Sequence, residues 1–348
     1  MEKHINIALH LQEDMLNVSW LSGNKPIMKK YHFELNKDKE IAFQIAKELL
    51  VEVHELNIKY VICPGGIVRP LKQGVYFIDE DVVREVKEHI WGVHANNEIT
   101  FICWELARLL SATALMCDPM SSDGLYILNR VTGHSQVKKF SRYNACGHQA
   151  AIYYTAKKLG KKPENLNLIV ADIDDEVSVG AHHFGVCIDV NDAVGLEGPM
   201  GFKSSGDIPV AQLAIHTEKH SINDLRYILR YESGVKGYLG TDDPEDLDRL
   251  AQSGNDYAVL IANAVAYQTA KWIGSSAMCL GGNVDLIVIM GKGIRSKLIL
   301  NSLLPRIQKI ASVECFEPNI SEYLLYVANV VESAPNQIMR IGGVNDGL

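Results

Sequence analysis

Short apolar segments near the N-terminus alternate with polar ones in a pattern that predicts three strands, a helix and a fourth strand. Residues 5–11 and 16–21 are typical of a hairpin, and residues 27–33 would add its third strand. Over residues 39–56, apolar side chains recur at four-residue spacing, which indicates an amphipathic helix. The apolar run at residues 60–63 then predicts a fourth, buried strand.

The same order of elements returns in the second half of the chain. Residues 168–171 form an apolar run, residues 177–181 alternate between apolar and polar, and residues 186–190 predict a third strand. A further buried strand is predicted at residues 286–290. This weak duplication, with little repetition of sequence, predicts an α/β fold built from two related halves.

Helical periodicity accounts for much of the remaining chain. The predicted helices cover residues 82–93 and 98–110, part of 138–157, the acidic and interrupted segment 221–265, residues 256–278, and segments that start at Ser296 and Ser321. We expect Asn96 and Asn97 to cap the helix at residue 98, and Thr241 or Asp242 to cap the helix that Pro244 begins. Residues 335–348 are expected to form a disordered tail.

Composition and charge limit the possible functions. The chain has 348 residues, of which 47% are hydrophobic and 22% charged, as in ordinary globular proteins of one or two domains. Its net charge of −8 is unlike the basic face of a nucleic-acid-binding protein. Neither a secretory signal nor a membrane-spanning run is recognisable, so we expect a cytoplasmic protein without nucleic-acid or membrane partners. The seven cysteines lack a paired spacing and are expected to be reduced thiols.

A series of motifs between residues 58 and 331 resembles one family. In chain order they are CPGGIVRPLKQGVYFID, VHANN, MCDP, AAIYYTAKKLGKK, IVADIDDEVSVGAHHFGVCIDVNDAVGLEGP, GYLGTDD and AVAYQTAKWIG. Together they resemble butyrate kinase and the related branched-chain fatty acid kinases. These belong with acetate kinase in the superfamily that includes sugar kinases and actin.

The resemblance implies an architecture, ligands and a partner. It implies two lobes of duplicated actin- and ribonuclease-H-like ββαβ topology with a cleft between them. Residues 1–140 would form the N-terminal lobe, with the C-terminal helix at 321–334 packing back on it. Residues 141–320 would form the counterpart of the nucleotide lobe, followed by a tail at 335–348. It also implies a homodimer, Mg-ATP as the cofactor of an active enzyme, and a small carboxylate or acyl phosphate as ligand.

The turn after residue 171 departs from the family at the place where it binds nucleotide phosphate. Asp172 stands where the family has a His, and Asp174, Asp175 and Glu176 replace a run of glycines. Glycines let main-chain N–H groups approach a phosphate closely. A carboxylate about 4 Å from phosphate costs on the order of 4 kcal/mol before screening. The alternatives are a solvated acidic hairpin turn or a metal site built from these carboxylates.

Two more phosphate-handling segments differ from the family. The turn of the first hairpin, residues 9–14, lacks Gly, Ser and Thr, and Met15 stands about where a basic residue is expected. Ser204 stands where the family has an Arg that stabilises the phosphoryl group in flight, and such a loss removes about 10³-fold or more in rate. Gly206 is kept. Lys203 is adjacent and either substitutes for the lost Arg or is a plain exposed lysine.

Some family positions are retained. Gly291 keeps the first of two glycines that line the adenosine pocket, and Lys292 replaces the second, where it either contacts a phosphate or crowds the pocket. Asp118 matches the catalytic Asp, but an Asp before proline is also a common turn residue. Glu322 is the candidate for positioning magnesium, and a Glu in a first helical turn also complements the helix dipole.

Four further residues are candidates for the acyl site. The family usually has an Arg near residue 64, and Arg69 either replaces it or is a solvated loop residue. Arg142 and His148 either face the acyl group or belong to a helix packed between the lobes. Glu197 lies in the retained Glu-Gly-Pro segment and is assigned to the substrate side of the site. No residues are assigned to a metal.

These observations leave three hypotheses for function. The first is a butyrate-kinase-like protein with a degraded nucleotide site, which acts as a non-catalytic partner of an active kinase paralogue or as a ligand sensor. The second is an active short-chain carboxylate kinase that converts butyrate and ATP to butyryl phosphate and ADP, using Asp118 with the displaced cations Arg69, Lys203 or Lys292. The third is a purely structural subunit.

Overall fold

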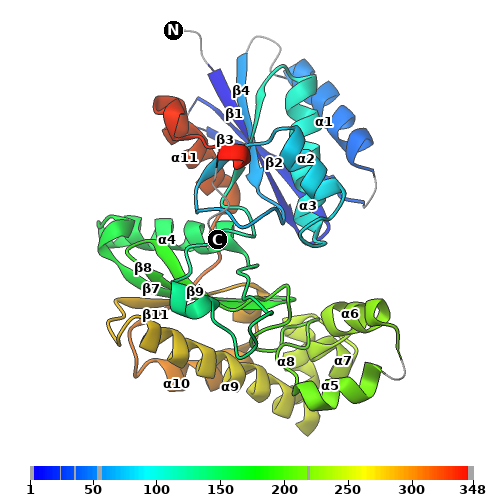
Figure 1. Cartoon of the computed structure of the whole chain (residues 1–348), viewed down its shortest axis with the longest axis vertical. Helices are drawn as coiled ribbons and strands as arrows, with labels where there is room; N and C mark the ends of the chain where they lie inside the picture. Colours follow the sequence, from blue (N-terminus) through cyan, green and yellow to red (C-terminus); the bar gives the residue numbers. More distant parts are fainter. Residues whose placement is uncertain (1–3, 24, 35–36, 53–56, 218–219, 344–348) are drawn as a thin grey trace. The chain divides into compact units, whose positions relative to one another are not determined.

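The chain forms two compact units (Figure 1). The structure is a computed structural model and describes residues 4–23, 25–34, 37–52, 57–217 and 220–343. Unit 1 comprises Met1–Asp123, Ala145–Ala150 and Asn319–Leu348, and unit 2 comprises Gly124–Asn144 and Ala151–Pro318. The domain limits predicted at residues 140 and 320, and the cleft between the lobes, stay predictions.

The sheet of unit 1 confirms the strands predicted near the N-terminus. Its strand order is β3-β2-β1-β4-β6-β5, in which β1, β2 and β3 form an antiparallel meander and β4 and β6 run parallel to β1. Alternate side chains of the meander, such as Ile7, Leu9 and Val18, are fully buried in the core, as their period of two predicts. The strands are β1 (His4–Gln12), β2 (Met15–Ser22), β3 (Lys25–His32), β4 (Asn57–Pro64), β5 (Val75–Phe77) and β6 (Thr113–Cys117).

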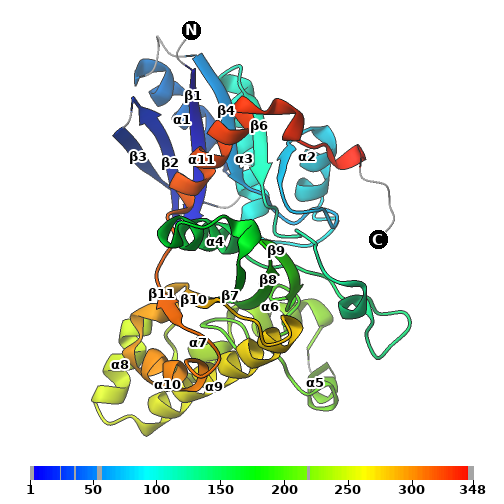
Figure 2. The ribbon, with the colours of Figure 1, turned by 90° about the vertical axis from the view of Figure 1, so that its left-hand side faces the viewer.

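Helices cover both faces of the unit 1 sheet (Figure 2). α1 and α3 pack on one face, and the four-residue spacing of α1 places Ile45 and Leu49 fully inside the core. α11 lies on the other face, where the buried Asn6 of β1 donates to Asn329 Oδ1 at 3.0 Å. The helices are α1 (Asp38–Glu52), α2 (Glu80–Lys87), α3 (Ala95–Leu109) and α11 (Ile320–Ser333). The helix predicted at 82–93 is therefore shorter, and residues 53–56 of the predicted first helix lie outside the described residues.

The predicted caps of α3 are wrong. His94 caps the helix, because its Nδ1 accepts the Asn96 N–H at 3.1 Å. Asn97 is buried inside the first turn, and its Oδ1 accepts the Ile67 N–H at 2.8 Å. Its amide therefore holds a neighbouring loop instead of the helix end. Sequence spacing alone does not distinguish these two uses of an asparagine.

The predicted cap of α8 (Pro244–Gln252) is displaced by one residue. Asp243 is the cap, and its Oδ1 accepts the Asp246 N–H at 2.9 Å. Thr241 instead accepts the Asp243 N–H at 3.2 Å, which shapes the chain before the helix. Asp242 points to two lysines described below. The prediction failed because three polar residues precede Pro244 and each has a different partner.

The chain after α11 is ordered where a disordered tail was expected. Residues 335–343 contain two short 3₁₀ turns, η4 (Pro335–Gln337) and η5 (Ile341–Gly343). Met339 pairs with β5, since Phe77 N–H donates to Met339 O at 2.9 Å. Ile341 is fully buried in the unit 1 core. The expectation is thus wrong for this segment because its apolar side chains are buried. Residues 344–348 lie outside the described part of the chain.

The sheet of unit 2 repeats the topology of unit 1 without the edge strand β5. Its order is β11-β10-β7-β8-β9, in which β7, β8 and β9 form an antiparallel meander and β10 and β11 run parallel to β7 and β10. The strands are β7 (Asn167–Ile173), β8 (Val177–His183), β9 (Val186–Val190), β10 (Leu286–Met290) and β11 (Val313–Cys315). Two sheets with one topology confirm the duplicated α/β fold that the sequence predicts.

Helices also cover both faces of the unit 2 sheet (Figure 1). α9 and α10 bury Ile261, Val265 and Leu303 against one face. The second half of α4 buries Ile152 and Ala156 against the other. The helices are α4 (Ala145–Leu159), α5 (Val210–Thr217), α6 (Ile222–Tyr231), α7 (Gly234–Leu239), α8, α9 (Asp256–Cys279) and α10 (Lys297–Ile307). This framework leaves the β7–β8 turn and the turn after β10 side by side, because β7 and β10 are parallel neighbours.

Candidate functional site

A later loop covers the acidic turn between β7 and β8. Phe202 N–H donates to Asp174 O at 3.0 Å. Two more main-chain bonds reach Asp175 O, from Lys203 N–H at 3.1 Å and Ser204 N–H at 2.9 Å. Ser204 is 2% exposed, so no longer side chain fits there without rearrangement. The turn is half-buried by this loop, although the Asp175 side chain is still 40% exposed, so it is less solvated than the alternative of a solvated acidic hairpin turn assumes.

Two lysines and two aspartates form a closed ring of ion pairs at this turn. Lys203 Nζ lies 2.8 Å from Asp175 Oδ2 and 3.1 Å from Asp242 Oδ2. Lys292 Nζ bonds to Asp175 Oδ1 and lies 3.3 Å from Asp242 Oδ2. Burial opposes the charged form of Lys203, but the two carboxylates outweigh it and raise its pKa above the ordinary value. We call these four residues the ion-pair ring. Lys203 and Lys292 are therefore neither plain exposed lysines nor uncommitted cations.

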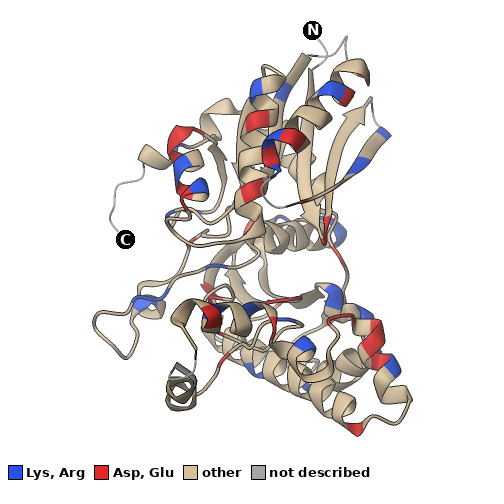
Figure 3. Cartoon of the chain, turned by 90° about the vertical axis from the view of Figure 1, so that its right-hand side faces the viewer, with Lys and Arg blue, Asp and Glu red and all other residues tan. Residues whose placement is uncertain are grey.

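The other acidic residue of the turn is also paired. Glu176 Oε1 lies 2.5 Å from Arg230 Nε, and both side chains are largely buried, at 17% and 11% exposed. Burial raises the pKa of Glu176, although the Arg230 charge acts in the opposite direction. Positions of acidic and basic residues are interspersed along the ribbon of unit 2 (Figure 3). The negative charge that the sequence places at this turn is thus largely balanced by cations from elsewhere in unit 2.

Main-chain donors of the two turns bind carboxylates of the chain itself. Asp174 accepts the Asp175 N–H at 2.8 Å with Oδ1 and the Lys292 N–H at 3.4 Å with Oδ2. The Gly291 N–H acts to lower the pKa of the Glu317 carboxyl. Burial, followed by the nearby Asp175 charge, raises the pKa of Asp174. Partial desolvation, followed by the Asp174 charge, raises the pKa of Glu317 to about 7. N–H groups that bind anions at such turns are therefore already occupied.

Asp172 lies at the end of β7, in surroundings that favour the protonated form of its carboxyl. Its Oδ2 accepts a hydrogen bond from Asn144 Nδ2 at 2.8 Å. Its Oδ1 is buried and has no hydrogen-bond partner among the described residues. Burial, followed by the Asp174 charge, raises the pKa of Asp172 well above its ordinary value. Gly291 approaches closely: with φ +85°, a Cβ on it would lie 2.4 Å from Asp172 Oδ1.

Gly206 closes the loop that carries Ser204. Its φ is +61°, and a Cβ there would lie 2.5 Å from Gly198 O. The loop is fixed at its base because Asp207 N–H donates to Gly198 O at 2.8 Å and Gly198 N–H donates to Asp207 Oδ1 at 3.0 Å. The retained glycine is thus required by local packing, whatever else the loop does.

Arg142 and Glu197 both form hydrogen bonds with Asp192. Arg142 binds Asp192 with both arms of its guanidinium, with Nε 2.9 Å from Oδ1 and Nη2 2.6 Å from Oδ2. Glu197 Oε2 accepts the Asp192 N–H at 2.8 Å, and Glu197 Oε1 lies 3.2 Å from Lys139 Nζ. His148 is fully buried and belongs to unit 1. The structure therefore brings Arg142 and Glu197 together in unit 2.

Asp118 is a buried turn residue of unit 1. It follows β6, is 3% exposed and has φ +44°. Its Oδ1 accepts the Gly74 N–H at 2.9 Å and its Oδ2 accepts the Tyr323 hydroxyl at 3.0 Å. Burial raises its pKa to about 6, although these bonds and one from Cys117 act in the opposite direction. Both carboxylate oxygens are used within unit 1, which favours the structural alternative for this residue.

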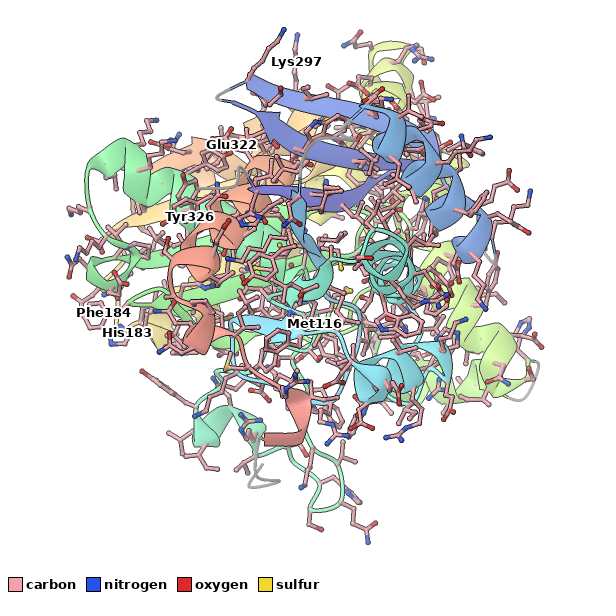
Figure 4. All side chains as sticks on the ribbon, turned by 90° about the horizontal axis from the view of Figure 1, so that it is seen from above. Met116, His183, Phe184, Lys297, Glu322 and Tyr326 are labelled. Atoms are coloured by element: carbon pink, nitrogen blue, oxygen red, sulfur yellow. The ribbon has the colours of Figure 1, made fainter. Side chains whose placement is uncertain are left out.

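Arg69 and Glu322 are two further candidates in unit 1. Arg69 is bound to the buried Glu85, with Nε 2.7 Å from Oε1 and the main-chain N–H 2.9 Å from Oε2. Glu322 lies on the exposed side of α11, one turn before Tyr326 (Figure 4). Its main-chain N–H donates to the cap residue Asn319 at 3.1 Å. Arg69 is thus a paired cation and not a plain solvated loop residue.

We expect unit 1 to become less stable as pH rises from about 5 to 8. Burial raises the pKa of Asp118 to about 6, and burial together with the neighbouring Glu98 carboxyl raises the pKa of Asp38 to about 7. An acid with a raised pKa binds more protons when folded, so the unfolding free energy falls as pH climbs from about 4 through the folded pKa. Thermal unfolding between about pH 5 and 8 measures this slope.

The control for this pH dependence is Asp38→Asn. It removes one titrating group that is 8% exposed while keeping its size. The variant should melt at a higher temperature than the unmodified protein at about pH 8 and show a shallower slope. A midpoint that rises steadily from about pH 5 to pH 8 in the unmodified protein would contradict the prediction.

The structure collects most of the nucleotide-site candidates in unit 2. Those that share contacts are Asp172, Asp174, Asp175, Glu176, Lys203, Ser204, Gly291 and Lys292. Sequence reasoning missed the partners Arg230, Asp242, Glu317 and Asp192, since no local motif marks them. Among the described residues, no three His, Cys, Asp or Glu side chains are arranged to hold a metal ion. Within the same part of the chain, no helix has the length and apolarity needed to cross a membrane.

The duplicated sheets define a two-domain α/β protein of the actin-like class. The acetate kinase of Porphyromonas gingivalis has this fold, with a TM-score of 0.74 at 14% identity, over 95% of this chain and 99% of that one. The family model described as acetokinase family matches residues 121–314. The chain belongs to the acetokinase family.

Curated relatives agree with the motifs. The chain is 30% identical to a probable butyrate kinase of Listeria monocytogenes over 81% of each chain. It is 33% identical to a probable butyrate kinase of Coprothermobacter proteolyticus over 70% of each chain. The resemblance drawn from the motifs is confirmed at the level of the family. The roles assigned to single residues stay predictions.

Proposed function

We propose that this acetokinase-family protein has lost phosphoryl transfer and serves in the cytoplasm as a non-catalytic partner of an active kinase of its family. The observation that carries the proposal is the ion-pair ring, in which Lys203 and Lys292 each bind two carboxylates. Mg-ATP fits these residues poorly, because its phosphates need the same ammonium and N–H groups. Phosphoryl transfer in such folds depends on positioned positive charge, and here that charge is committed.

The size of the repulsion between a nucleotide phosphate and the Asp175 carboxylate supports the proposal. A phosphate that reached the lysines would lie about 4 Å from Asp175, at a cost on the order of 4 kcal/mol before screening. Such a cost converts a dissociation constant of about 1 μM into about 1 mM. Displacing the Asp174 carboxylate would add to this cost, because it would lose its hydrogen bonds from the Asp175 and Lys292 N–H groups. Nucleotide binding at cellular concentrations would then be weak.

A partner role has more support than a ligand sensor. The cation expected to bind a small carboxylate or acyl phosphate, Arg142, is held by Asp192 in a two-armed ion pair. Arg69 is similarly held by Glu85. A carboxylate ligand would have to displace a carboxylate of the chain at either position. Sensing of such a ligand is therefore an alternative outcome of the test and not the proposal.

Helix α9 offers a surface for the partner. Four exposed apolar side chains lie at spacings of three, seven and eleven residues, which places them along one stripe of the helix. They are Tyr257, Leu260, Tyr267 and Met278. Exposed apolar stripes of this kind are typical of subunit interfaces. We infer that the active kinase of the family proposed above covers it.

The proposal is tested with the purified protein, butyrate, ATP and magnesium. Acyl phosphate trapped as the hydroxamate should not exceed the level without protein, while a butyrate kinase of established activity gives a clear signal. Calorimetry should show no ATP binding below millimolar concentration. Clear turnover by this protein would end the proposal in favour of an active carboxylate kinase. A thermal shift with small carboxylates but not with nucleotides would favour the sensor.

A further inference from the structure

The carboxylates of the acidic turn lie where an anion would be expected. Asp174 accepts two main-chain N–H groups, those of Asp175 and Lys292. Asp175 accepts both lysine ammonium groups, those of Lys203 and Lys292. Two ammonium groups and two N–H groups that converge on one turn are the donors of a typical anion site. Here the chain supplies the anion itself.

We propose that Asp174 and Asp175 act as a built-in anion, which occupies a site that would otherwise bind a diphosphate group. The inference rests on the proposed function and explains it by occupancy: the donors for a phosphate are present and are satisfied internally. It differs from the sequence interpretation, in which the acidic turn only repels phosphate. If repulsion were the whole reason, removing the carboxylates would leave a surface without affinity for anions.

The lysines are well placed to bind an anion once they are released. The side chain of Lys292 is 15% exposed and that of Lys203 is 30% exposed, so both ammonium groups are shielded in part from water. Lys292 Nζ also lies 5.0 Å from the centre of the Phe202 ring, which limits where the ammonium moves. Partly shielded charges interact more strongly than fully exposed ones. An anion that replaced Asp175 would therefore meet two oriented cations.

Asp172 gives independent evidence that a hydrogen-bond partner is missing at this turn. Its side chain is 5% exposed, and its Oδ1 has no hydrogen-bond partner among the described residues. That oxygen lies against Gly291, the residue before Lys292. Its environment favours the protonated form, so the carboxyl is a potential hydrogen-bond donor. An anion oxygen beside Gly291 would accept from it, and the carboxylates of Asp174 and Asp175 do not.

The test removes the two charges and keeps the shape. In the full chain, Asp174→Asn combined with Asp175→Asn removes the Asp175 carboxylate from both lysines and leaves them one shared carboxylate, that of Asp242. Calorimetry with inorganic pyrophosphate at low ionic strength should give a dissociation constant at least about tenfold below that of the unmodified protein. The matched control is Glu232→Gln combined with Glu314→Gln. It changes the net charge equally and breaks two surface ion pairs, with Lys236 and Lys158. It should not gain affinity.

A third substitution identifies the donors. Adding Lys292→Gln to the double variant should return pyrophosphate affinity to the level of the unmodified protein. The proposal is overturned if the folded double variant binds no more tightly than the control, if the unmodified protein binds equally well, or if Lys292→Gln changes nothing. Inorganic phosphate, tested in parallel, should bind more weakly because it spans fewer donors.

A second variant keeps the proposal open to refutation if the double variant does not fold. Asp242→Asn removes the second carboxylate of the ion-pair ring from both lysines, at a side chain that is 39% exposed. It should strengthen pyrophosphate binding by about threefold, and no gain there would also overturn the proposal. None of these results depends on kinase activity of the unmodified protein. Failure of this inference is therefore distinguishable from failure of the proposed function.

Discussion

Replacing Gly291 with alanine is expected to lower the free energy of unfolding by about 2–5 kcal/mol, through backbone strain and overpacking. At φ +85° the strain for an L-residue is about 1–2 kcal/mol. The new Cβ would also lie 2.4 Å from Asp172 Oδ1 and 2.6 Å from Ile173 O. Because the second atom belongs to the main chain of β7, it cannot rotate away. A thermal scan by circular dichroism should show a midpoint about 5–15 °C lower.

The control for this substitution is Gly274→Ala in α9. No heavy atom lies within 4 Å of a Cβ built on Gly274, and its φ is not positive. Alanine in a helix interior is favoured over glycine by about 0.5–1 kcal/mol, so this variant should be slightly more stable. The same chemical change is thus expected to have opposite signs at two sites in unit 2. A Gly291→Ala variant that melts with the unmodified protein would refute the steric argument.

The survival of Gly291 therefore has a sufficient explanation in packing. The same holds for Gly206, where a Cβ would lie 2.5 Å from Gly198 O. Both residues match the family, yet neither match requires that a nucleotide binds. What distinguishes this chain is the neighbouring residue, Lys292, whose side chain is tied into the ion-pair ring. Retained glycines are weak indicators of retained activity when their φ values are positive.

The strands and helices of this fold are predictable because buried positions are apolar and recur at the period of a strand or a helix. The meander of unit 2 was predictable from alternation over residues 177–181, since one face of β8 is packed against α9. Helix α9 was predictable from its length and period. The cap of α3 was not, because spacing along the chain does not show which main-chain N–H groups lie near His94 and Asn97. The ordered segment after α11 depends on a distant strand edge at β5.

The charges of the site were visible in the sequence, but their pairing was not. Asp174 to Glu176 are an obvious acidic run, and their isolation in sequence suggested uncompensated repulsion. The structure supplies the counter-charges from far away, as with Lys292, which binds Asp175 from 117 positions along the chain. Local spacing carries no record of such a contact. The same limit hid Arg230, which binds Glu176 from 54 positions away.

Replacing Asp118 with alanine is expected to lower the free energy of unfolding by about 2–4 kcal/mol. The carboxylate accepts the Gly74 N–H at 2.9 Å, the Tyr323 hydroxyl at 3.0 Å and the Cys117 thiol at 3.2 Å, and alanine would remove the acceptor of all three hydrogen bonds. Each orphaned buried donor costs about 1–3 kcal/mol. Part of the loss is offset because the buried carboxylate is itself costly, as its pKa of about 6 indicates. Urea unfolding near neutral pH measures the difference.

The matched variant Asp118→Asn separates structure from chemistry. Asparagine keeps an oxygen for the Gly74 N–H and tolerates φ +44°, so it should cost less than alanine, about 1 kcal/mol. It also removes the group with a raised pKa, so unfolding should depend less on pH near 6. If both variants are as stable as the unmodified protein, the carboxylate has no structural role and its match to the catalytic Asp needs another reason. If alanine is the costlier variant, the turn at the end of β6 accounts for a hydrogen-bond acceptor at this position, and the match alone does not require an active kinase.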